Sequence, residues 1–548
     1  MKTDPALSRP LLAMLAVSAV LAACGGSDDD NNAAPAPLPT IACSFDTTVA
    51  LAFEEQRLTT PLPNTGANVV GTDTTPIADR IVRDTGFDTF TGDFATSLCG
   101  SDGTTTITSY QGAVDLVKAK GSALWRGAVD RVQGRRPSPA TSKLPNSDDR
   151  MLYWTRVQMT KLLRQWKPAF TMTPAQLTDL QLQFERSSRG QYDINLPAGE
   201  ASQGRKYRRM IISGFDTFTL GTPGTPNTGL RNGNPSGATA LEMDGREFTL
   251  SDGTVLHVEA YILPVSYDPF NLGMQEDTLG PWFKPGPMRV DASITISQGS
   301  ANVFNLEQFN GRFHGPSAGN DGIVYCPAGT RLPSFILPLG TVTATGTAPI
   351  SLPNSGCDVY PPQRWLGYDD SIWMKDFPPQ FTLTTLPIPA MVTGHTQAGV
   401  PRPPGATSAG SEGFDVTWHT NFVYFPLCTD PATVSVPSNG VVNLMPDVST
   451  VPSPNATWCS RQGGGGDYLS NESAYRNTLL RDVFALDIPA GHIHVPVMTN
   501  FFGGTAGTGG GVRDDNAITD ARFEAYRTAI VAQTKALLLV IGNSLMYR

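Results

Sequence analysis

From about residue 205 to the C-terminus, short β-branched segments alternate with helical ones. Strands are expected at 210–212, 254–267, 290–296 and 493–497. The last helical segment, 519–541, places Phe523, Tyr526, Ile530, Leu537 and Ile541 on one helix face. Strands that alternate with helices build parallel sheets, because each parallel connection must cross back over the sheet. Residues 205–548 therefore predict an α/β domain with a substantially parallel sheet.

The N-terminus predicts export. Lys2 and Arg9 precede an apolar run over 11–23 that is too short to span a bilayer. The run ends in Leu21-Ala22-Ala23-Cys24, and residues 24–40 form a flexible linker. This order is similar to the lipobox of bacterial lipoproteins; an ordinary secretory signal is the alternative. We expect a signal peptide over 1–23, lipidation of Cys24, and anchoring in the cell envelope at the outer membrane, on its periplasmic or surface face.

Six cysteines follow Cys24 in the chain. An even number in an oxidising compartment predicts three disulfides. Neighbours in the sequence are the expected pairs: Cys43–Cys99, Cys326–Cys357 and Cys428–Cys459. If all six are paired, none of their thiols remains to act as a nucleophile.

Composition limits the partners and the number of domains. A net charge of −9 without a long basic block argues against nucleic acid as a partner. The length of 548 residues allows two or more domains, and 40% hydrophobic residues is enough for real cores. Residues 41–204 predict a mainly helical region, with helices at 149–166 and 174–187, and give no functional prediction. Residues 315–462 are dense in Pro and Gly and hold four cysteines, which predicts a long disulfide-stapled insertion outside the sheet.

Four short motifs after residue 205 carry the functional prediction. The first is Ile212-Ser213-Gly214-Phe215-Asp216-Thr217-Phe218, followed by Asn234-Pro235-Ser236. The second is Gln298-Gly299-Ser300-Ala301-Asn302, which leads to Leu306-Glu307. The third is Gly466-Asp467-Tyr468-Leu469-Ser470-Asn471, with Tyr475 behind it, and the fourth is Ile493-His494-Val495-Pro496. Each motif stands in a strand or turn setting.

In this order, the motifs resemble those of pyroglutamyl peptidase I, the pyrrolidone-carboxylate peptidase family. That family has G-F-x-x-F and N-P-S, a Gln/Gly-rich turn before its catalytic glutamate, G-x-Y-x-C-N, and I-H-[IV]-P. The resemblance covers about 207–314 and 462–541. Ser470 replaces the nucleophilic cysteine, the turn before Glu307 is one residue short, and the insertion lengthens the spacing to Ser470. The implied fold is an α/β/α sandwich with a mixed, largely parallel sheet.

The resemblance implies a catalytic set of Ser470, His494 and Glu307. Ser470 would attack an amide carbonyl, His494 would accept and return its proton, and Glu307 would hold the imidazole tautomer. Backbone N–H groups at 466–471 would form an oxyanion site. The expected substrate is an N-terminal pyroglutamyl or related small amide, bound without metal or cofactor. Its contacts would come from Phe215, Phe218, Gln298 and Asn471, with the two phenylalanines flanking a flat lactam ring.

Other interpretations of the same residues stay open. His494 could be a core histidine, or His492 and His494, two positions apart on a strand, could bind a metal. Ser470 could instead cap the helix that starts there, Phe215 and Phe218 could be core residues, and Glu307 could be a solvated carboxylate. The histidines at 257, 314, 395 and 419 are scattered and carry no functional prediction.

Serine at position 470 leaves three functional hypotheses. The first is an envelope-anchored hydrolase of the pyroglutamyl peptidase I type. The second is a catalytically inactive binding or structural lipoprotein on the same fold, and the third is a serine esterase or amidase of other specificity. A hydroxyl needs a general base during attack, whereas a thiol ionises by itself near neutrality. We favour the hydrolase because His494 and Glu307 are both retained.

Overall fold

The computed structural model describes residues 38–199, 206–315, 317–323, 379–427, 432–445, 447–498, 501 and 513–545. The predicted signal peptide, Cys24, Cys326, Cys357 and Cys428 lie outside these residues. From Thr40 onward the chain forms one compact unit. Within the described ranges, no helix combines the length and the apolar character needed to cross a bilayer.

The N-terminal region is mainly helical where it is described. The helices predicted at 149–166 and 174–187 are confirmed as α4 and α5. Thr173 caps α5 with a reciprocal bond pair to Gln176, and Pro174 occupies the first turn, where its missing N–H costs nothing. The elements are α1 (Ile77–Asp84), α2 (Asp88–Leu98), α3 (Tyr110–Val132), α4 (Arg150–Gln165), α5 (Pro174–Ser187), the 3-10 helix η1 (Glu55–Thr59), and the strands β1 (Ile41–Phe45), β2 (Thr104–Thr105) and β3 (Trp166–Pro168).

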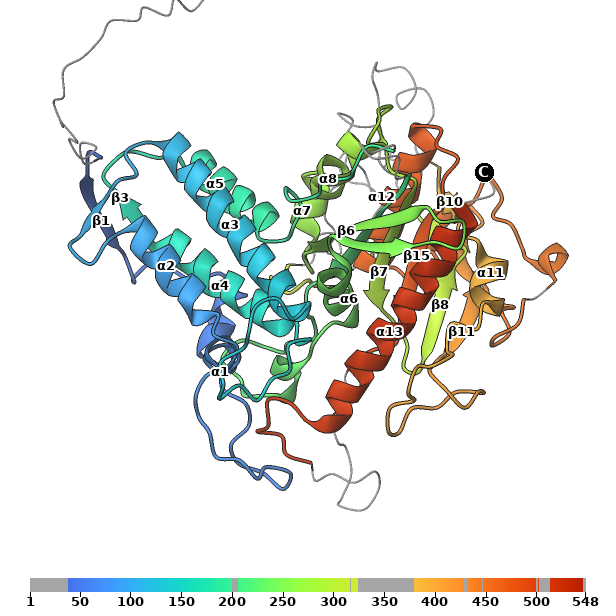
Figure 1. Ribbon diagram of the computed structural model, residues 1–548, viewed down its shortest axis with the longest axis horizontal. Helices are drawn as coiled ribbons and strands as arrows, with labels where there is room; N and C mark the ends of the chain where they lie inside the picture. Colours follow the sequence, from blue (N-terminus) through green and yellow to red (C-terminus); the bar gives the residue numbers. More distant parts are fainter. Residues whose placement is uncertain are drawn as a thin grey trace, which may run out of the picture. The chain divides into compact units, whose positions relative to one another are not determined.

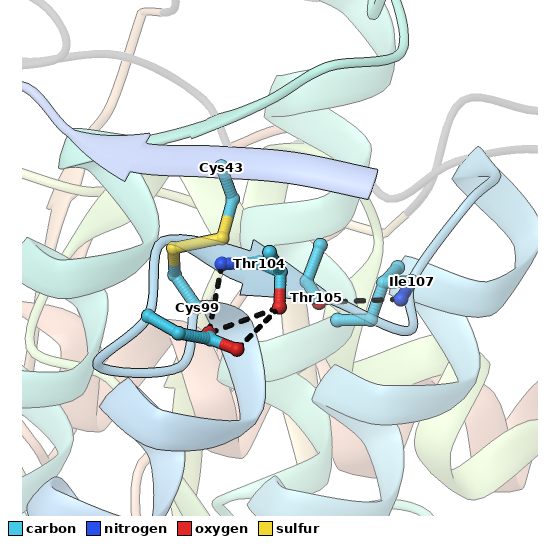
Figure 2. The surroundings of a disulfide bond; sticks show 6 residues. Cys43, Cys99, Thr104, Thr105 and Ile107 are labelled. Atoms are coloured by element: carbon cyan, nitrogen blue, oxygen red, sulfur yellow. Dashed lines mark hydrogen bonds between the residues drawn. A yellow bond between two sulfur atoms is a disulfide. The ribbon is translucent and has the colours of Figure 1, made fainter. Parts of the chain in front are cut away.

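A disulfide joins strand β1 to the end of helix α2. Cys43 lies on β1, where it pairs with Pro168 of β3, and Cys99 follows the last residue of α2 (Figure 2). The predicted Cys43–Cys99 pair is therefore confirmed. Cys459 is also disulfide-bonded, but the pairings predicted for Cys326, Cys357 and Cys428 fall outside the described residues.

A seven-stranded mixed sheet organises the rest of the chain. Its order is β11-β8-β15-β7-β4-β6-β5. Strands β15, β7, β4 and β6 are parallel, β8 and β11 run opposite to β15, and β5 runs opposite to β6. The predicted α/β class is confirmed. The strands are β4 (Tyr207–Phe215), β5 (Arg246–Thr249), β6 (Val255–Leu263), β7 (Ala292–Gln298), β8 (Val303–Glu307), β11 (Asp415–His419) and β15 (Ala490–Val495).

Helices cover both faces of this sheet. Helices α6 (Pro235–Met243) and α13 (Ala521–Ser544) pack on one face, with α13 crossing the strands in Figure 1. Helices α8 (Met274–Phe283) and α12 (Leu469–Val483) lie on the other. Shorter elements complete the described part: α7 (Tyr267–Asn271), α11 (Ile388–Thr393), η2 (Thr228–Arg231), η3 (Val448–Thr450), β9 (Phe309–Gly311), β10 (Phe381–Leu383), β12 (Phe422–Phe425), β13 (Val434–Val436) and β14 (Cys459–Gln462).

The two faces of the sheet differ in chemistry because strand side chains alternate. The α13 face is apolar and contributes Met210, Ile212, Ile294, Ile296, Ile493 and Val495 to the main core. The α12 face carries a row of buried polar side chains on the central strands: Ser293, Thr295, Ser297, Asn305, Glu307, His492 and His494. The Ser293 hydroxyl bonds Asn477 of α12 at 2.6 Å, which fixes the side of the sheet to which this row belongs.

Two sequence predictions about the sheet need correction. Residues 315–462 were expected to lie outside it, yet β11 joins it as an edge strand and pairs with β8 over its whole length. A five-residue edge strand among Pro and Gly gives little local signal. The strand expected over 254–267 ends at Leu263, because Pro264 has no N–H to donate, and α7 begins at Tyr267.

Candidate active site

Glu307 and His494 meet on the polar face of the sheet. Glu307 ends β8, and His494 lies on the neighbouring strand β15, one diagonal step away in the register. The imidazole Nδ1 donates to Glu307 Oε1 at 2.6 Å. Glu307 is fully buried and His494 nearly so. The bond fixes the tautomer of His494 and leaves its Nε2 as the nitrogen that can exchange a proton.

A second histidine, which the sequence analysis passed over, bonds the other oxygen of Glu307. His419 ends β11, directly opposite Glu307 in the register, and its Nδ1 donates to Oε2 at 2.8 Å. Although burial disfavours a charged carboxylate, the imidazoles of His419 and His494 hold the pKa of Glu307 well below its usual value. Burial also opposes charge on His419, but the Glu307 carboxylate outweighs it and raises the pKa of His419.

Ser470 lies in the first turn of α12. Tyr468 is the cap residue of this helix, so the interpretation of Ser470 as the N-cap is wrong. Ser470 lines a pocket, and none of the described residues, His494 included, forms a hydrogen bond with its hydroxyl. Unliganded catalytic groups often stand further apart than in the complex with substrate.

The glycine turn Gly463–Gly466 lies between the His494 imidazole and the start of α12, and it is in close contact with both. A Cβ atom at Gly465 would lie 3.1 Å from His494 Cε1 and 3.5 Å from the backbone nitrogen of Asn471. A Cβ atom at Gly464 would lie 2.2 Å from Glu307 Oε2. Only glycine therefore allows this turn to pass so close to both groups.

The pocket beside Ser470 is small, with a volume of about 30 Å³. It brings together four of the predicted site residues, Phe215, Phe218, Gln298 and Ser470. The other lining residues are Asn234, Val265, Ser297, Tyr468 and Leu469, so no charged side chain of the described residues borders it. Gln298 is 9% exposed, and its Oε1 is buried without a hydrogen-bond partner in the described structure. The pocket suits a small, flat, neutral group that carries one N–H donor.

Asn471 does not point into this pocket. Its side-chain oxygen accepts from the Gly311 N–H at 2.8 Å, and its amide nitrogen donates to the Gly311 and Phe313 carbonyls at 2.8 and 2.9 Å. The side chain thus fastens α12 to the segment after β9. Only the backbone N–H of Asn471 therefore remains available for the predicted contact with the substrate.

His492 has a structural explanation. It is fully buried, and the hydroxyls of Thr295 and Ser297 lie 2.8 Å from its Nδ1 and Nε2. Burial, with His494 adding to it, lowers the pKa of His492 far below its usual value, so the ring is neutral. The described parts of the chain contain no group of three or more His, Cys, Asp or Glu side chains placed to hold a metal ion.

The N-terminal region holds the loop that carries Phe215 and Phe218. Asp216, between them, is buried and accepts two bonds from Arg156 of α4, at 3.0 and 2.7 Å, and a further one from Arg189. The Thr217 carbonyl accepts from the Asn320 side chain at 2.8 Å. Arg156 and Arg189 thus hold the loop that lines one wall of the pocket, and no sequence motif indicated this role.

The fold and the site define an α/β protein whose mixed sheet carries a buried Glu–His pair beside an uncharged pocket. The chain belongs to the PA0049 family: the PA0049 N-terminal domain matches residues 32–185, and the PA0049 C-terminal domain matches residues 209–499. It is 63% identical, over 540 residues and 98% of each chain, to PA0049 of Pseudomonas aeruginosa, a protein described as uncharacterized.

Solved structures of pyroglutamyl peptidases are more distant neighbours. Pyrrolidone carboxyl peptidase from Pyrococcus furiosus is 14% identical, with 62% of this chain and 99% of that chain covered and a TM-score of 0.29. Pyroglutamyl peptidase I from Bacillus amyloliquefaciens is 12% identical, with 62% and 96% covered and a TM-score of 0.27. Scores this low carry no argument about activity, so the proposal below rests on the site itself.

Proposed function

We propose that the protein is an envelope-anchored amide hydrolase that releases an N-terminal pyroglutamyl or related small cyclic acyl group. Ser470 is the nucleophile, His494 the general base and acid, and Glu307 the carboxylate that orients the imidazole. The observation that carries this proposal is the buried bond from His494 Nδ1 to Glu307 Oε1, beside a pocket that Ser470 lines.

The chemistry follows from these positions. His494 Nε2 takes the proton of Ser470 as the hydroxyl oxygen bonds to the amide carbon, and returns it to the leaving amine as the C–N bond breaks. The first N–H groups of α12 have no partner inside the helix and suit the developing oxyanion, which the positive end of the helix also favours. Water, activated by the same imidazole, then hydrolyses the acyl ester and restores Ser470.

The pocket supports a lactam in particular. Phe215 and Phe218 offer apolar surface to a flat ring, and the unpaired Gln298 Oε1 can accept a lactam N–H. A glutamyl residue would bring an ammonium and a carboxylate into a pocket without counter-ions. Burying even a neutral polar group without a hydrogen bond costs about 2–7 kcal/mol, and burying a charge costs more. The neutral pyroglutamyl ring avoids this cost.

His419 completes the proposed site as a positioning residue. A serine hydroxyl needs an imidazole as its base, and an ionised carboxylate holds that imidazole in place. Although burial opposes charge on both groups, Glu307 raises the pKa of His419, and His419 in turn lowers the pKa of Glu307. His419 therefore helps to keep Glu307 ionised and bonded to the imidazole of His494.

A fluorophosphonate probe, which labels activated serines, tests the proposal. We expect labelling at Ser470 in the wild-type protein, loss of labelling in Ser470→Ala and His494→Ala, and normal labelling in the control Ser449→Ala. Ser470→Ala should lower the hydrolysis of a pyroglutamyl coumarin amide by at least about 1000-fold. Absence of labelling in a folded wild-type protein would instead support a binding or structural role, and hydrolysis of simple esters without pyroglutamyl amides would support an esterase.

The membrane anchor is the second part of the proposal, and the sequence around Cys24 supports it. Metabolic labelling with an alkyne fatty acid should tag the wild-type chain, and Cys24→Ser should abolish the tag and release the protein from the membrane fraction. A wild-type chain that stays untagged and fractionates with the periplasm would overturn the anchor without touching the hydrolase proposal.

A further inference from the structure

A second pocket adjoins the one that holds Ser470. Phe218 and Tyr468 line both pockets, and their ring centroids lie 6.4 Å apart. The second pocket has a volume of about 350 Å³, and Arg57, Gly221 and Asn320 also line it. Arg57 comes from η1 in the N-terminal region, so this pocket joins parts of the chain that are far apart in sequence.

Arg57 is a buried cation without a counter-ion. The residue is only 4% exposed, and its guanidinium lies 4.9 Å from the centre of the Phe53 ring. Nε donates to the Gly221 carbonyl at 3.1 Å, and Nη1 donates to the Asn320 carbonyl at 2.6 Å. In the described part of the chain, no carboxylate lies within ion-pair distance of Arg57, and Nη2 makes no hydrogen bond.

The acidic residues nearest in sequence to Arg57 and Asn320 are Glu54, Glu55 and Asp321, and each is engaged elsewhere. Glu54 accepts from the Tyr153 hydroxyl at 2.8 Å, Glu55 from Arg164 at 2.9 Å, and Asp321 from the Ser266 hydroxyl at 2.5 Å. Buried arginines are almost always paired with an anion, because an unpaired buried charge is costly. The carbonyl groups hold the guanidinium in place but leave its charge uncompensated.

We propose that the second pocket binds a carboxylate on the leaving-group side of the substrate, with Arg57 as the residue that recognises it. This inference rests on the proposed function and names its substrate class: short pyroglutamyl peptides with a free C-terminal carboxylate. The lactam occupies the pocket between Phe215 and Phe218, and the rest of the peptide passes Phe218 and Tyr468 into the second pocket. A guanidinium matches a carboxylate better than any other ligand, through charge and paired N–H donors.

Kinetics with matched substrates test the inference in the full-length protein. Pyroglutamyl-alanine is compared with pyroglutamyl-alanine amide, which lacks only the negative charge. We expect wild-type kcat/KM to be at least about tenfold higher for the acid, mostly through KM, which is the discrimination expected of one charge-assisted contact. Arg57→Gln should bring the acid-to-amide ratio to about one, and Arg57→Lys should retain part of it. Arg83→Gln, which removes an exposed charge from the same region, should keep the wild-type ratio.

Equal rates for acid and amide in the wild-type protein would overturn the inference and leave the proposed function intact. Calorimetric titration of Ser470→Ala with the same two compounds covers the case in which neither is hydrolysed. Tighter binding of the acid, lost in Ser470→Ala/Arg57→Gln but kept in Ser470→Ala/Arg57→Lys, would support the carboxylate site while the hydrolase proposal falls. No preference for the acid in this titration would overturn the carboxylate site. Arg57→Lys and circular dichroism show separately whether the variants are folded, so a loss of binding cannot be mistaken for unfolding.

Discussion

Glu307 stays ionised although it is fully buried, because an imidazole faces each of its two oxygens. This arrangement makes His419 the residue whose replacement should change the pH dependence of the protein most. His419→Gln keeps a hydrogen-bond donor but removes a positive charge. Burial already opposes charge on Glu307, so loss of the His419 imidazole should raise the pKa of this carboxyl.

The acid limb of kcat/KM for a pyroglutamyl amide should therefore move upward in His419→Gln, because Glu307 is protonated more easily once His419 no longer lowers its pKa. His257→Gln is the matched control. Burial opposes charge on this histidine as well, but Glu259 raises its pKa, and the pair lies on β6, away from Glu307. An unchanged acid limb in His419→Gln, with a folded protein, would remove His419 from the mechanism.

Asp149 provides a pH test that is independent of function. It is buried, its Oδ1 has no partner in the described structure, and burial together with the neighbouring Asp148 raises its pKa to about 7. In the unfolded chain the pKa of this carboxyl is roughly 3.9. Between these values the folded state holds a proton that the unfolded state has lost, so the free energy of unfolding decreases as pH rises through this window.

Asp149→Asn cannot ionise and should escape this loss. We expect it to exceed the wild type in the free energy of unfolding by on the order of 2 kcal/mol at pH 8, and to match it near pH 5. Denaturant unfolding at the two pH values gives both numbers. A variant that is equally destabilised at pH 5 and pH 8 would show that Asp149 is ionised and needed as an anion in the folded state.

At the scale of elements, the Gly463–Gly466 turn leads from β14 to α12 and lies against Glu307 of β8 and His494 of β15. Gly464→Ala would place a methyl group 2.2 Å from Glu307 Oε2, so either the turn or the carboxylate must move. We expect kcat to decrease by about 10- to 100-fold, because small displacements of catalytic groups have effects of this size. Gly92→Ala on α2, where the new methyl group meets nothing within 4 Å, is the control and should leave kcat unchanged. Full activity of Gly464→Ala would mean that Glu307 is not needed in its present position.

Local patterns predicted some elements well and others poorly. The helix expected at 519–541 is α13, and the strands around 210, 290 and 493 are β4, β7 and β15. These elements could be recognised because the local sequence carries their signal, a helical repeat of apolar residues in the first case and short β-branched runs in the others. Strand β11 could not be recognised in this way. Residues 415–419 become a strand by pairing with 303–307, more than one hundred positions earlier in the chain, and the role of His419 depends on that register.

At the scale of the whole molecule, the N-terminal region is joined to the site by charge. Asp216, within the G-F-x-x-F loop, is bonded by Arg156 and Arg189. Asp216→Asn would leave two buried guanidinium groups without this carboxylate. We expect a loss of about 3 kcal/mol in the free energy of unfolding and a raised KM for pyroglutamyl amides, because Phe215 and Phe218 lose their fixed position.

Chemical denaturation and steady-state kinetics measure these two effects. Asp93→Asn breaks a pair with Lys120 that is partly exposed, and it should cost less than about 1 kcal/mol and leave KM unchanged. If Asp216→Asn were as mild as this control, the N-terminal region would have no part in holding the loop.

The motifs located residues that meet at the candidate site, but not the residues that hold them in place. Glu307, His494, Ser470 and the two phenylalanines were found from short motifs, and the structure brings Glu307 and His494 into contact and the other three around one pocket. The contributions of Arg57, Arg156, Arg189 and His419 could not be found, since each acts across a contact between distant segments and none belongs to a motif.

The division of the sheet into an apolar and a polar face has a consequence for how β15 can vary. His492 and His494 alternate with Ile493 and Val495, so exchanging one aliphatic residue for another changes the packing at a single place. Losing one residue between Ala490 and His492 would rotate the remainder of the strand by half a turn, pushing both imidazoles under α13 and both aliphatic side chains against α12. Aliphatic substitutions in this strand should be tolerated, whereas the insertion or deletion of one residue should abolish both folding and turnover.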